Sequence, residues 1–402
     1  MNAFFKDSAF QFATENALGE AYHQATDVGE VLATIARVPN GDGKAWVTAW
    51  SAAGDRLAGL AREAESTGHR RSAAARWLRA ASYYASATDM ADATGTFTEV
   101  WERHRGAWDK FVDLTTAIGD TLIERIDVPY EETTLPGYVF RTPSGGAPGA
   151  RRCLIYVNGS DGSVVGAWSR CAAAALARDW TVVTVDGPGQ NAALVRQGLP
   201  FRPDWEAVLT PLIDHLATRP DIDPARIAVL GISQGGFWVP RAVAHEHRAA
   251  AAVADPGVVD VSSAMLAHLP GFLRKVLEAG DREKFDKEMA LGLKFSAGER
   301  TTLAWRMRPY GVTSYYDFFT AAAQYRLSDQ DLAAIRCPLL VTDPENEQFW
   351  PGQAARLAQA VTGPVTLLPF TAAEGADGHC EPLAAGLRGE RILDWLDEHV
   401  PA

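Results

Sequence analysis

The stretch that most constrains the fold of this chain is residues 227–236, Ile-Ala-Val-Leu-Gly-Ile-Ser-Gln-Gly-Gly. It starts as an apolar run with β-branched residues, which is typical of a buried parallel strand. Through Gly-x-Ser-x-Gly it passes into a helix-like segment at residues 237–247. Glycines on both sides permit a turn so tight that the serine between them is strained. We therefore predict that Ser233 is a nucleophile beside a helix N-terminus, which favours negative charge. The alternative is a plain glycine-serine turn.

Strand-like and helix-like segments alternate around this stretch. The expected strands after the first two lie at residues 153–157, 181–185, 227–232, 249–254, 337–342 and 365–370. Helical segments at residues 167–178, 205–219, 354–360 and 391–399 separate most of them. Such alternation predicts an α/β fold, a mostly parallel, doubly wound sheet with helices on both faces. Two earlier strands, at residues 122–128 and 137–140, are expected to be antiparallel at one edge.

The first part of the chain is different, because residues 1–118 carry helical periodicity and few strand signals. Four residues recur at helical spacing and form one apolar stripe: Trp77, Leu78, Ala81 and Tyr84. The stripe predicts packing of helix on helix. The alternative is that Trp77, Tyr83 or Tyr84 lines a substrate pocket. We predict an all-helical N-terminal cap domain at residues 1–118.

A second helical region interrupts the alternation at about residues 258–335. It would lie at the carboxyl edge of the sheet, where ligands bind in open α/β folds. Insertions at this place often act as lids. The 402 residues are enough for two domains. We therefore predict an α/β domain at residues 119–402 that carries a helical lid.

The general base is expected after the last strand. In sheets that present a serine in this way, the chain order is serine, then acid, then histidine. His245 and His247 fall in the predicted helix after Ser233, His268 falls in the insertion, and His399 lies near the terminus. His379 lies in a loop directly after the last strand, so we predict that it is the general base.

The acid should follow the strand at residues 338–342, where three carboxylates occur: Asp343, Glu345 and Glu347. Glu347 best matches the usual offset of a few residues past the strand end. Asp343 is the first alternative, although it could also cap the strand end. Glu345 is the second alternative. The acid would orient the imidazole and stabilise its protonated form.

An oxyanion hole needs two backbone N–H groups. The residue after the nucleophile, Gln234, would supply one of them. The other would come from the Gly/Ser/Asp-rich loop at residues 157–163, with Ser160 or Asp161 as the donor. A simple surface turn of the same composition is the alternative.

Composition excludes several classes of partner. The formal net charge of −12 argues against nucleic acid. No segment approaches the roughly 20 apolar residues of a membrane span, and no signal peptide is evident, so we expect a cytoplasmic protein. The four cysteines, at positions 153, 171, 337 and 380, form no CxxC pair, so neither a disulfide framework nor a metal site is expected. The Gly-Pro-Gly loop at residues 187–189 lacks the spacing of a dinucleotide site, and no cofactor is expected.

Four stretches together resemble one branch of the α/β-hydrolase family. They are residues 186–190 (Asp-Gly-Pro-Gly-Gln), 201–206 (Phe-Arg-Pro-Asp-Trp-Glu), 231–236 and 377–380 (Asp-Gly-His-Cys). The branch contains dihydropseudooxynicotine hydrolase and the fungal polyketide chain-shortening hydrolases, and its core is similar to those of dienelactone hydrolases, esterases and S9 peptidases. Residues 79–84 resemble its N-terminal helical domain. The resemblance spans most of the chain.

The resemblance implies hydrolysis of a carbon–carbon bond beside a ketone by a Ser, acid and His triad. Ser233 matches the nucleophile and His379 matches the base. Glu347 matches a position that usually holds aspartate, and residues 159–162 are less acidic than the corresponding loop of the family. The implied substrate is a small carbonyl compound such as a β-diketone or a polyketide, and a homodimer is suggested.

Other activities use the same residues. An ester, thioester or lactone hydrolase differs only in its leaving group, and a cyclase or acyl transferase differs in replacing water by another nucleophile. From another class, a catalytically inactive binding module could keep the fold. A peptidase is disfavoured because no acidic pair is placed to hold a peptide N-terminus.

Overall fold

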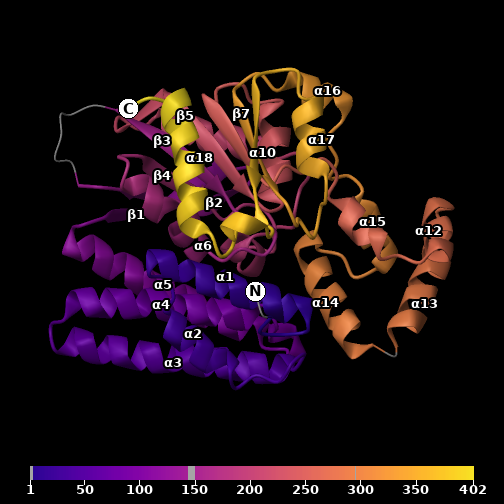
Figure 1. Cartoon of the computed structure of the whole chain (residues 1–402), viewed down its shortest axis with the longest axis horizontal. Coiled ribbons are helices and arrows are strands. Elements are labelled where there is room, and N and C mark those ends of the chain that lie inside the picture. The colour runs from indigo at the N-terminus through magenta and orange to yellow at the C-terminus, as the bar shows by residue number, and fades with distance from the viewer. Residues whose placement is uncertain (1–2, 144–149, 295) are drawn as a thin grey trace.

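The structure is a computed structural model that describes residues 3–143, 150–294 and 296–402. Its centre is an eight-stranded sheet (Figure 1). In spatial order the strands are β1 (Leu122–Tyr130), β2 (Thr133–Arg141), β4 (Thr181–Val185), β3 (Arg151–Val157), β5 (Ile222–Ile232), β6 (Ala251–Asp255), β7 (Leu339–Pro344) and β8 (Val365–Phe370). The pairs β1–β2 and β2–β4 are antiparallel, and the remaining pairs are parallel. The predicted α/β fold, with antiparallel strands at one edge, is confirmed.

Helices cover both faces of this sheet, because its strands are apolar on both sides. Along β3, Leu154 and Tyr156 belong to one hydrophobic cluster, whereas Cys153 and Ile155 belong to the other. The first face packs against α5 (Phe97–Ile118), α6 (Val165–Ala167), α7 (Ala173–Leu176) and α18 (Ala385–His399). The second face packs against α9 (Glu206–Ala217), α10 (Gly235–Val243) and α17 (Gln353–Ala360). The short helix α8 (Asn191–Val195) follows β4.

The N-terminal helices form a layer beside the sheet, below it in Figure 1. They are α1 (Ser8–Gly19), α2 (Val28–Ile35), α3 (Gly43–Ser66), α4 (Arg70–Thr88) and α5. Trp77, Tyr83 and Tyr84 are all buried in the hydrophobic cluster of this layer. They are therefore core residues, as the helix-packing interpretation predicts.

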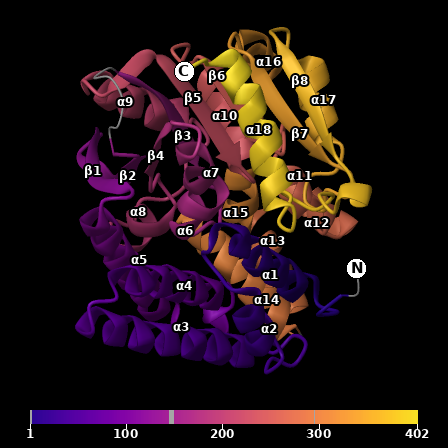
Figure 2. The same ribbon diagram turned by 60° about the vertical axis from the view of Figure 1, so that its left-hand side comes forward.

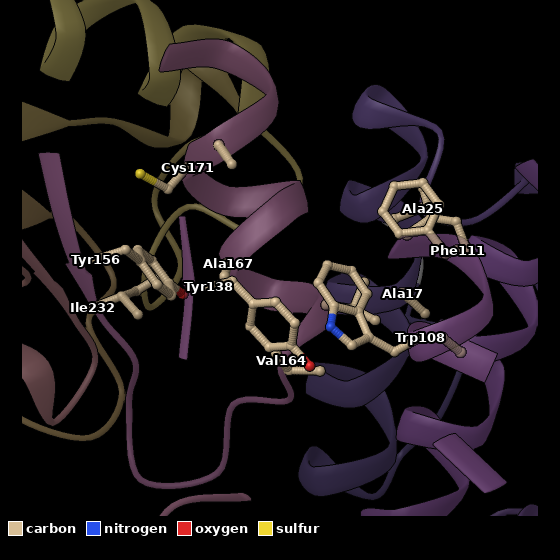
Figure 3. Packing of buried hydrophobic residues seen from close by; sticks show 14 of the residues in the cluster. Ala17, Ala25, Trp108, Phe111, Tyr138, Tyr156, Val164, Ala167, Cys171 and Ile232 are labelled. Atoms are coloured by element: carbon tan, nitrogen blue, oxygen red, sulfur yellow. The ribbon is translucent and has the colours of Figure 1, made fainter. Parts of the chain in front are cut away.

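The helical layer and the sheet share that hydrophobic cluster (Figure 3). The ring of Trp108 on α5 meets the ring of Tyr138 on β2 edge to face, with centroids 5.6 Å apart. Phe111 contacts Trp168 in the same manner at 5.3 Å. The division into two domains at residue 118 stays a prediction, because one continuous core spans both sides of it.

A helical insertion lies between β6 and β7. It comprises α11 (Ser262–Ala267), α12 (Gly271–Glu278), α13 (Arg282–Leu293), α14 (Ala297–Met307), the 3-10 turn Arg308–Tyr310, α15 (Tyr315–Ala322) and α16 (Asp329–Ala334). Helices α12 and α13 project away from the sheet (Figure 1). In contrast, Arg308 forms an ion pair with Asp92 and lies 4.0 Å above the ring of Phe97. The insertion therefore contacts the N-terminal helices, as the arrangement in Figure 2 also indicates.

Candidate active site

The turn between β5 and α10 holds Ser233 in a left-handed backbone conformation, with φ of 57°. A Cβ atom on Gly231 would lie 2.1 Å from the carbonyl oxygen of Gly235. A Cβ atom on Gly235 would lie 2.8 Å from the carbonyl oxygen of Val157. Both positions therefore require glycine, and their close packing holds the serine in a conformation that L-residues rarely adopt.

Ser233, His379 and Glu347 form a continuous chain of hydrogen bonds. The His379 Nε2 atom lies 2.9 Å from the Ser233 hydroxyl, and Nδ1 lies 2.8 Å from a carboxylate oxygen of Glu347. His379 is 2% exposed and Glu347 is 9% exposed. Glu347 follows β7, and His379 follows β8 in the chain. With its Nδ1–H donated to Glu347, the imidazole presents Nε2 as an acceptor for the serine proton.

The surroundings of Glu347 favour its ionised form. Its second carboxylate oxygen accepts the N–H groups of Phe349 at 2.8 Å and Trp350 at 3.0 Å. Burial acts to raise the pKa of Glu347, but the charge of His379 and these hydrogen bonds outweigh it and hold the pKa below its usual value. The carboxylate is therefore charged at neutral pH and can stabilise a protonated imidazole.

The two alternative acids are directed elsewhere. Glu345 is exposed, and its carboxylate accepts the N–H of Ala372 at 2.8 Å. Asp343 is half-buried, and burial together with the charge of Glu347 raises its pKa. Neither residue makes a hydrogen bond to His379. Of the three carboxylates after β7, the structure brings Glu347 to the imidazole.

The other histidines after Ser233 do not reach it. The helix expected over residues 237–247 is shorter than predicted, because α10 ends at Val243 and His245 and His247 lie beyond it. His245 instead binds a carboxylate oxygen of Asp331 at 2.8 Å. His399 is exposed and stacks on Trp395.

The loop after β3 passes directly over Ser233. A Cβ atom on Gly159 would lie 2.8 Å from the Cβ atom of Ser233, so only glycine fits there. The Gly159 N–H donates to the Asn158 side chain at 3.0 Å and is not available to a substrate. Among the described residues, the N–H groups of Gln234, Ser160 and Asp161 donate to no protein acceptor. These three groups remain the candidates for an oxyanion hole.

Gln190, the last residue of the Asp-Gly-Pro-Gly-Gln stretch, holds this loop in place. Its side-chain amide donates to the carbonyl oxygens of Asn158 at 2.8 Å and Gly159 at 3.0 Å. Its own oxygen accepts the N–H of Gly187 at 3.1 Å. The part that the Gly-Pro-Gly loop plays is therefore to position Gln190, whose side chain supports the backbone beside Ser233.

An aromatic enclosure around His379 includes a residue that the sequence does not reveal. Phe349 and Trp350 lie 4.7 Å and 5.5 Å from the imidazole, measured between ring centroids. Phe12 on α1 lies 5.9 Å from the imidazole and 5.4 Å from Phe349. No motif points to Phe12, because only the folded chain brings α1 to the loop after β8. The N-terminal helices therefore form part of the wall of the site.

The structure also contains a buried ion pair next to the turn at Ser233 that the sequence does not reveal. Arg388 on α18 donates to Asp255 at the end of β6, with Nε and Oδ2 2.5 Å apart. Thr342 donates to the other carboxylate oxygen at 2.8 Å. The backbone carbonyl of Asp255 accepts the N–H of Ser233 at 2.6 Å and lies 3.4 Å from the thiol of Cys380. Asp255 thereby connects the nucleophile turn, β7 and the histidine loop.

Replacing Arg388 with methionine should destabilise the protein strongly. Asp255 is fully buried, so its charge would lose its partner without gaining water. We expect a cost of about 3–5 kcal/mol, which thermal unfolding would detect as a fall in Tm. Arg391→Met is the matched control on the same helix, because Arg391 pairs with Glu374 at the surface and the loss of an exposed ion pair should lower Tm much less. Equal falls in Tm for the two variants would contradict this role of Arg388.

Two kinds of feature are absent from the described residues. Residues 3–143, 150–294 and 296–402 contain no group of three or more His, Cys, Asp or Glu placed to hold a metal ion. In the same residues, no helix combines the length and apolar character needed to cross a membrane.

Comparisons with known proteins identify the family of this chain. Residues 154–385 match the model of the Alpha/beta hydrolase family. The chain is 29% identical over 415 residues to Hydrolase LUC6 of a Fusarium species, covering 99% of this chain and 98% of the relative. It is 31% identical over 427 residues to Hydrolase acrC of Aspergillus aculeatus, with the same coverage. It is 27% identical over 353 residues to 20-hydroxy-prefusarin hydrolase FUS2 of Gibberella moniliformis, covering 85% and 83%.

Solved structures agree at the level of the fold. The crystal structure of the 2,6-dihydroxy-pseudo-oxynicotine hydrolase superposes with a TM-score of 0.72 at 18% identity and covers 95% of both chains. AbyA5 superposes with a TM-score of 0.61 at 19% identity and covers 93% and 94%. The resemblance seen in the sequence is confirmed, and the chain belongs to the alpha/beta hydrolase family, as a relative of these fungal hydrolases.

Proposed function

We propose that the protein is a serine hydrolase that cleaves a carbon–carbon bond next to a ketone through an acyl-enzyme on Ser233. The observation that carries the serine-hydrolase part of the proposal is the hydrogen-bonded chain from Ser233 through His379 to Glu347. The choice of a carbon–carbon bond rests on the resemblance to the branch described in the sequence analysis. This geometry provides a nucleophile, a general base and a carboxylate that orients the base.

In the proposed reaction, His379 removes the hydroxyl proton as Ser233 attacks a carbonyl carbon. The N–H of Gln234, with that of Ser160 or Asp161, stabilises the tetrahedral oxyanion. Collapse breaks the carbon–carbon bond, and the electron pair leaves as an enolate. Protonated His379 then gives its proton to the enolate carbon, and water hydrolyses the acyl-enzyme to a carboxylic acid.

Two polar side chains beside Ser233 support a substrate with a second oxygen. Among the described residues, the hydroxyl of Tyr310 and the side-chain nitrogen of Gln234 have no hydrogen-bond partner apart from a weak contact with each other. Burial raises the pKa of Tyr310 and the charge of Asp161 adds to this, so the hydroxyl stays protonated and can donate. Cleavage of a β-diketone needs a donor for the enolate oxygen, whereas cleavage of a simple ester does not.

The two helical parts of the chain are proposed to enclose the substrate. Residues 1–118 would act as a cap because Phe12 lies against His379. The insertion would act as a lid because the charge of Arg306 on α14, like that of His379, acts on the carboxyl group of Asp161 in the loop over Ser233.

A matched pair of substrates tests which bond is cleaved. Benzoylacetone and phenyl acetate would be incubated with the enzyme in ¹⁸O-water, and the products identified by mass spectrometry. We expect a labelled carboxylic acid and a free ketone from the diketone, and no product with Ser233→Ala. Intact diketone beside rapid ester hydrolysis would contradict carbon–carbon cleavage and assign ester, thioester or lactone hydrolysis instead.

A further inference from the structure

Glu381 takes no part in the contacts described above, although it is two residues after His379 and only 1% exposed. Neither of its carboxylate oxygens accepts a hydrogen bond from a donor within the described part of the chain. The nearest cation is Arg388, whose Nε lies 3.6 Å from Glu381 Oε2 but is already donated to Asp255. A buried carboxylate without donors would be strongly destabilising.

The charges at this place do not balance if every acid is ionised. Asp255, Glu381 and Arg388 are 0%, 1% and 3% exposed, so two carboxylates would share a single guanidinium. Two carboxylates that share one cation away from water cannot both ionise readily. Asp255 is the carboxylate that we expect to be ionised, because it accepts hydrogen bonds from both Arg388 and Thr342.

Of the other charged and titratable groups that the described residues place around the cluster, the one cation is Arg170, and its side chain is directed to Asn16 and Glu20. The groups that face the cluster from neighbouring elements are Glu20, His23, Tyr156, Arg170 and Glu347, together with Cys380 in the loop itself. Arg170 donates to Asn16 at 2.5 Å, and its charge acts on Glu20. Glu347 adds negative charge, which disfavours ionisation of Glu381 further.

We propose that Glu381 is a positioning residue, held as a neutral carboxylic acid that donates its proton in a hydrogen bond to Asp255. This bond would fix the loop that carries His379. Cys380 and Glu381 both have positive φ, 58° and 47°, so the loop is held in a conformation that needs support from its side chains. Burial, followed by the charge of Asp255, raises the pKa of Glu381 well above its usual value, in agreement with this state.

The protonation state has a consequence for stability that can be measured. A carboxyl whose pKa is raised by folding binds a proton that the unfolded chain releases above about pH 4.3. The folded state therefore loses stability as the pH rises from that value towards the folded pKa. Glu381→Gln keeps a neutral donor to Asp255 and removes the proton uptake. The variant should match the wild type in Tm near pH 5 and exceed it by at least about 2 °C at pH 8.5.

A matched control has the opposite sign. Glu374 is paired with Arg391, and hydrogen bonds lower its pKa to about 2. Its contribution to stability is present above the unfolded pKa and is lost at low pH, so Glu374→Gln should lower Tm at pH 8.5. If Glu381→Gln also lowered Tm at pH 8.5, Glu381 would be an ionised partner of Arg388 and the inference would be overturned.

The positioning role rests on the proposed function of His379 and needs a second measurement. Glu381→Leu removes the donor to Asp255, and we expect kcat for p-nitrophenyl acetate to fall about tenfold or more with KM nearly unchanged. Glu381→Gln should retain kcat within about threefold. Equal losses in both variants, or full activity of Glu381→Leu, would overturn the role. Failure of this inference can be told apart from failure of the proposed function. If the proposed function is wrong, Ser233→Ala and the wild type will be equally active. The Tm comparison of Glu381→Gln with the wild type decides the protonation state of Glu381 in either case.

Discussion

Replacing Ser233 with alanine should lower kcat for p-nitrophenyl acetate by about 10⁴-fold or more. The substitution removes the atom that would form the acyl-enzyme, while the glycines that shape the turn remain. Losses of this size are typical when a nucleophile that works with a general base is removed. The release of p-nitrophenol, followed by absorbance with a pre-steady-state burst, measures both the turnover and the acyl-enzyme.

A control for this variant should carry the same substitution outside the site. Ser262 is buried in α11, and its hydroxyl donates to Asp260 at 2.6 Å. Ser262→Ala should keep kcat within a few fold of the wild type. Turnover by Ser233→Ala at the rate of this control would exclude Ser233 as the nucleophile, whereas no turnover above background by the wild type would leave a binding module as the interpretation.

Replacing Glu347 with glutamine should lower kcat by roughly 10⁴-fold. The amide occupies nearly the same volume, and its oxygen can still accept the N–H groups of Phe349 and Trp350. It then presents an NH₂ group to Nδ1 of His379, which favours the wrong tautomer and gives no charge to stabilise the imidazolium. KM should change little, because the acid is not expected to touch the substrate.

The alternative acids provide the controls for Glu347. Asp343→Asn and Glu345→Gln neutralise carboxylates that follow the same strand but make no hydrogen bond to His379. Both should keep kcat within a few fold. If one of them lost activity while Glu347→Gln kept it, the assignment of the acid would move to that residue.

The sequence alone was sufficient where a local pattern is tied to backbone geometry. Gly-x-Ser-x-Gly requires a turn at Ser233, and the structure contains it with both glycines in close contact. Chain order then selected His379, because the fold delivers a loop there after its last strand. The prediction made the helix after the turn longer than it is, because the composition stays helix-forming to residue 247. In the structure α10 ends at Val243, and His245 binds Asp331, which is distant in the chain.

Choosing among Asp343, Glu345 and Glu347 required the folded chain. Their spacing from the strand differs by only a few residues, and the direction of each side chain depends on the turn after β7. In that turn the N–H groups of Phe349 and Trp350 hold the Glu347 carboxylate toward His379. Sequence spacing cannot show which carboxylate receives those donors.

The sequence by itself therefore determined the α/β fold, the turn at Ser233 and the place of His379 after the last strand, because each depends on local backbone geometry or on chain order. Only the tertiary structure decided which acid binds His379 and that the ring of Phe12 packs near the imidazole. It also decided that Asp255, Glu381 and Arg388 lie together in the interior. These contacts join residues from distant parts of the chain. The free energy of these contacts depends on burial and on the charges brought together there, and both exist only after the chain has folded.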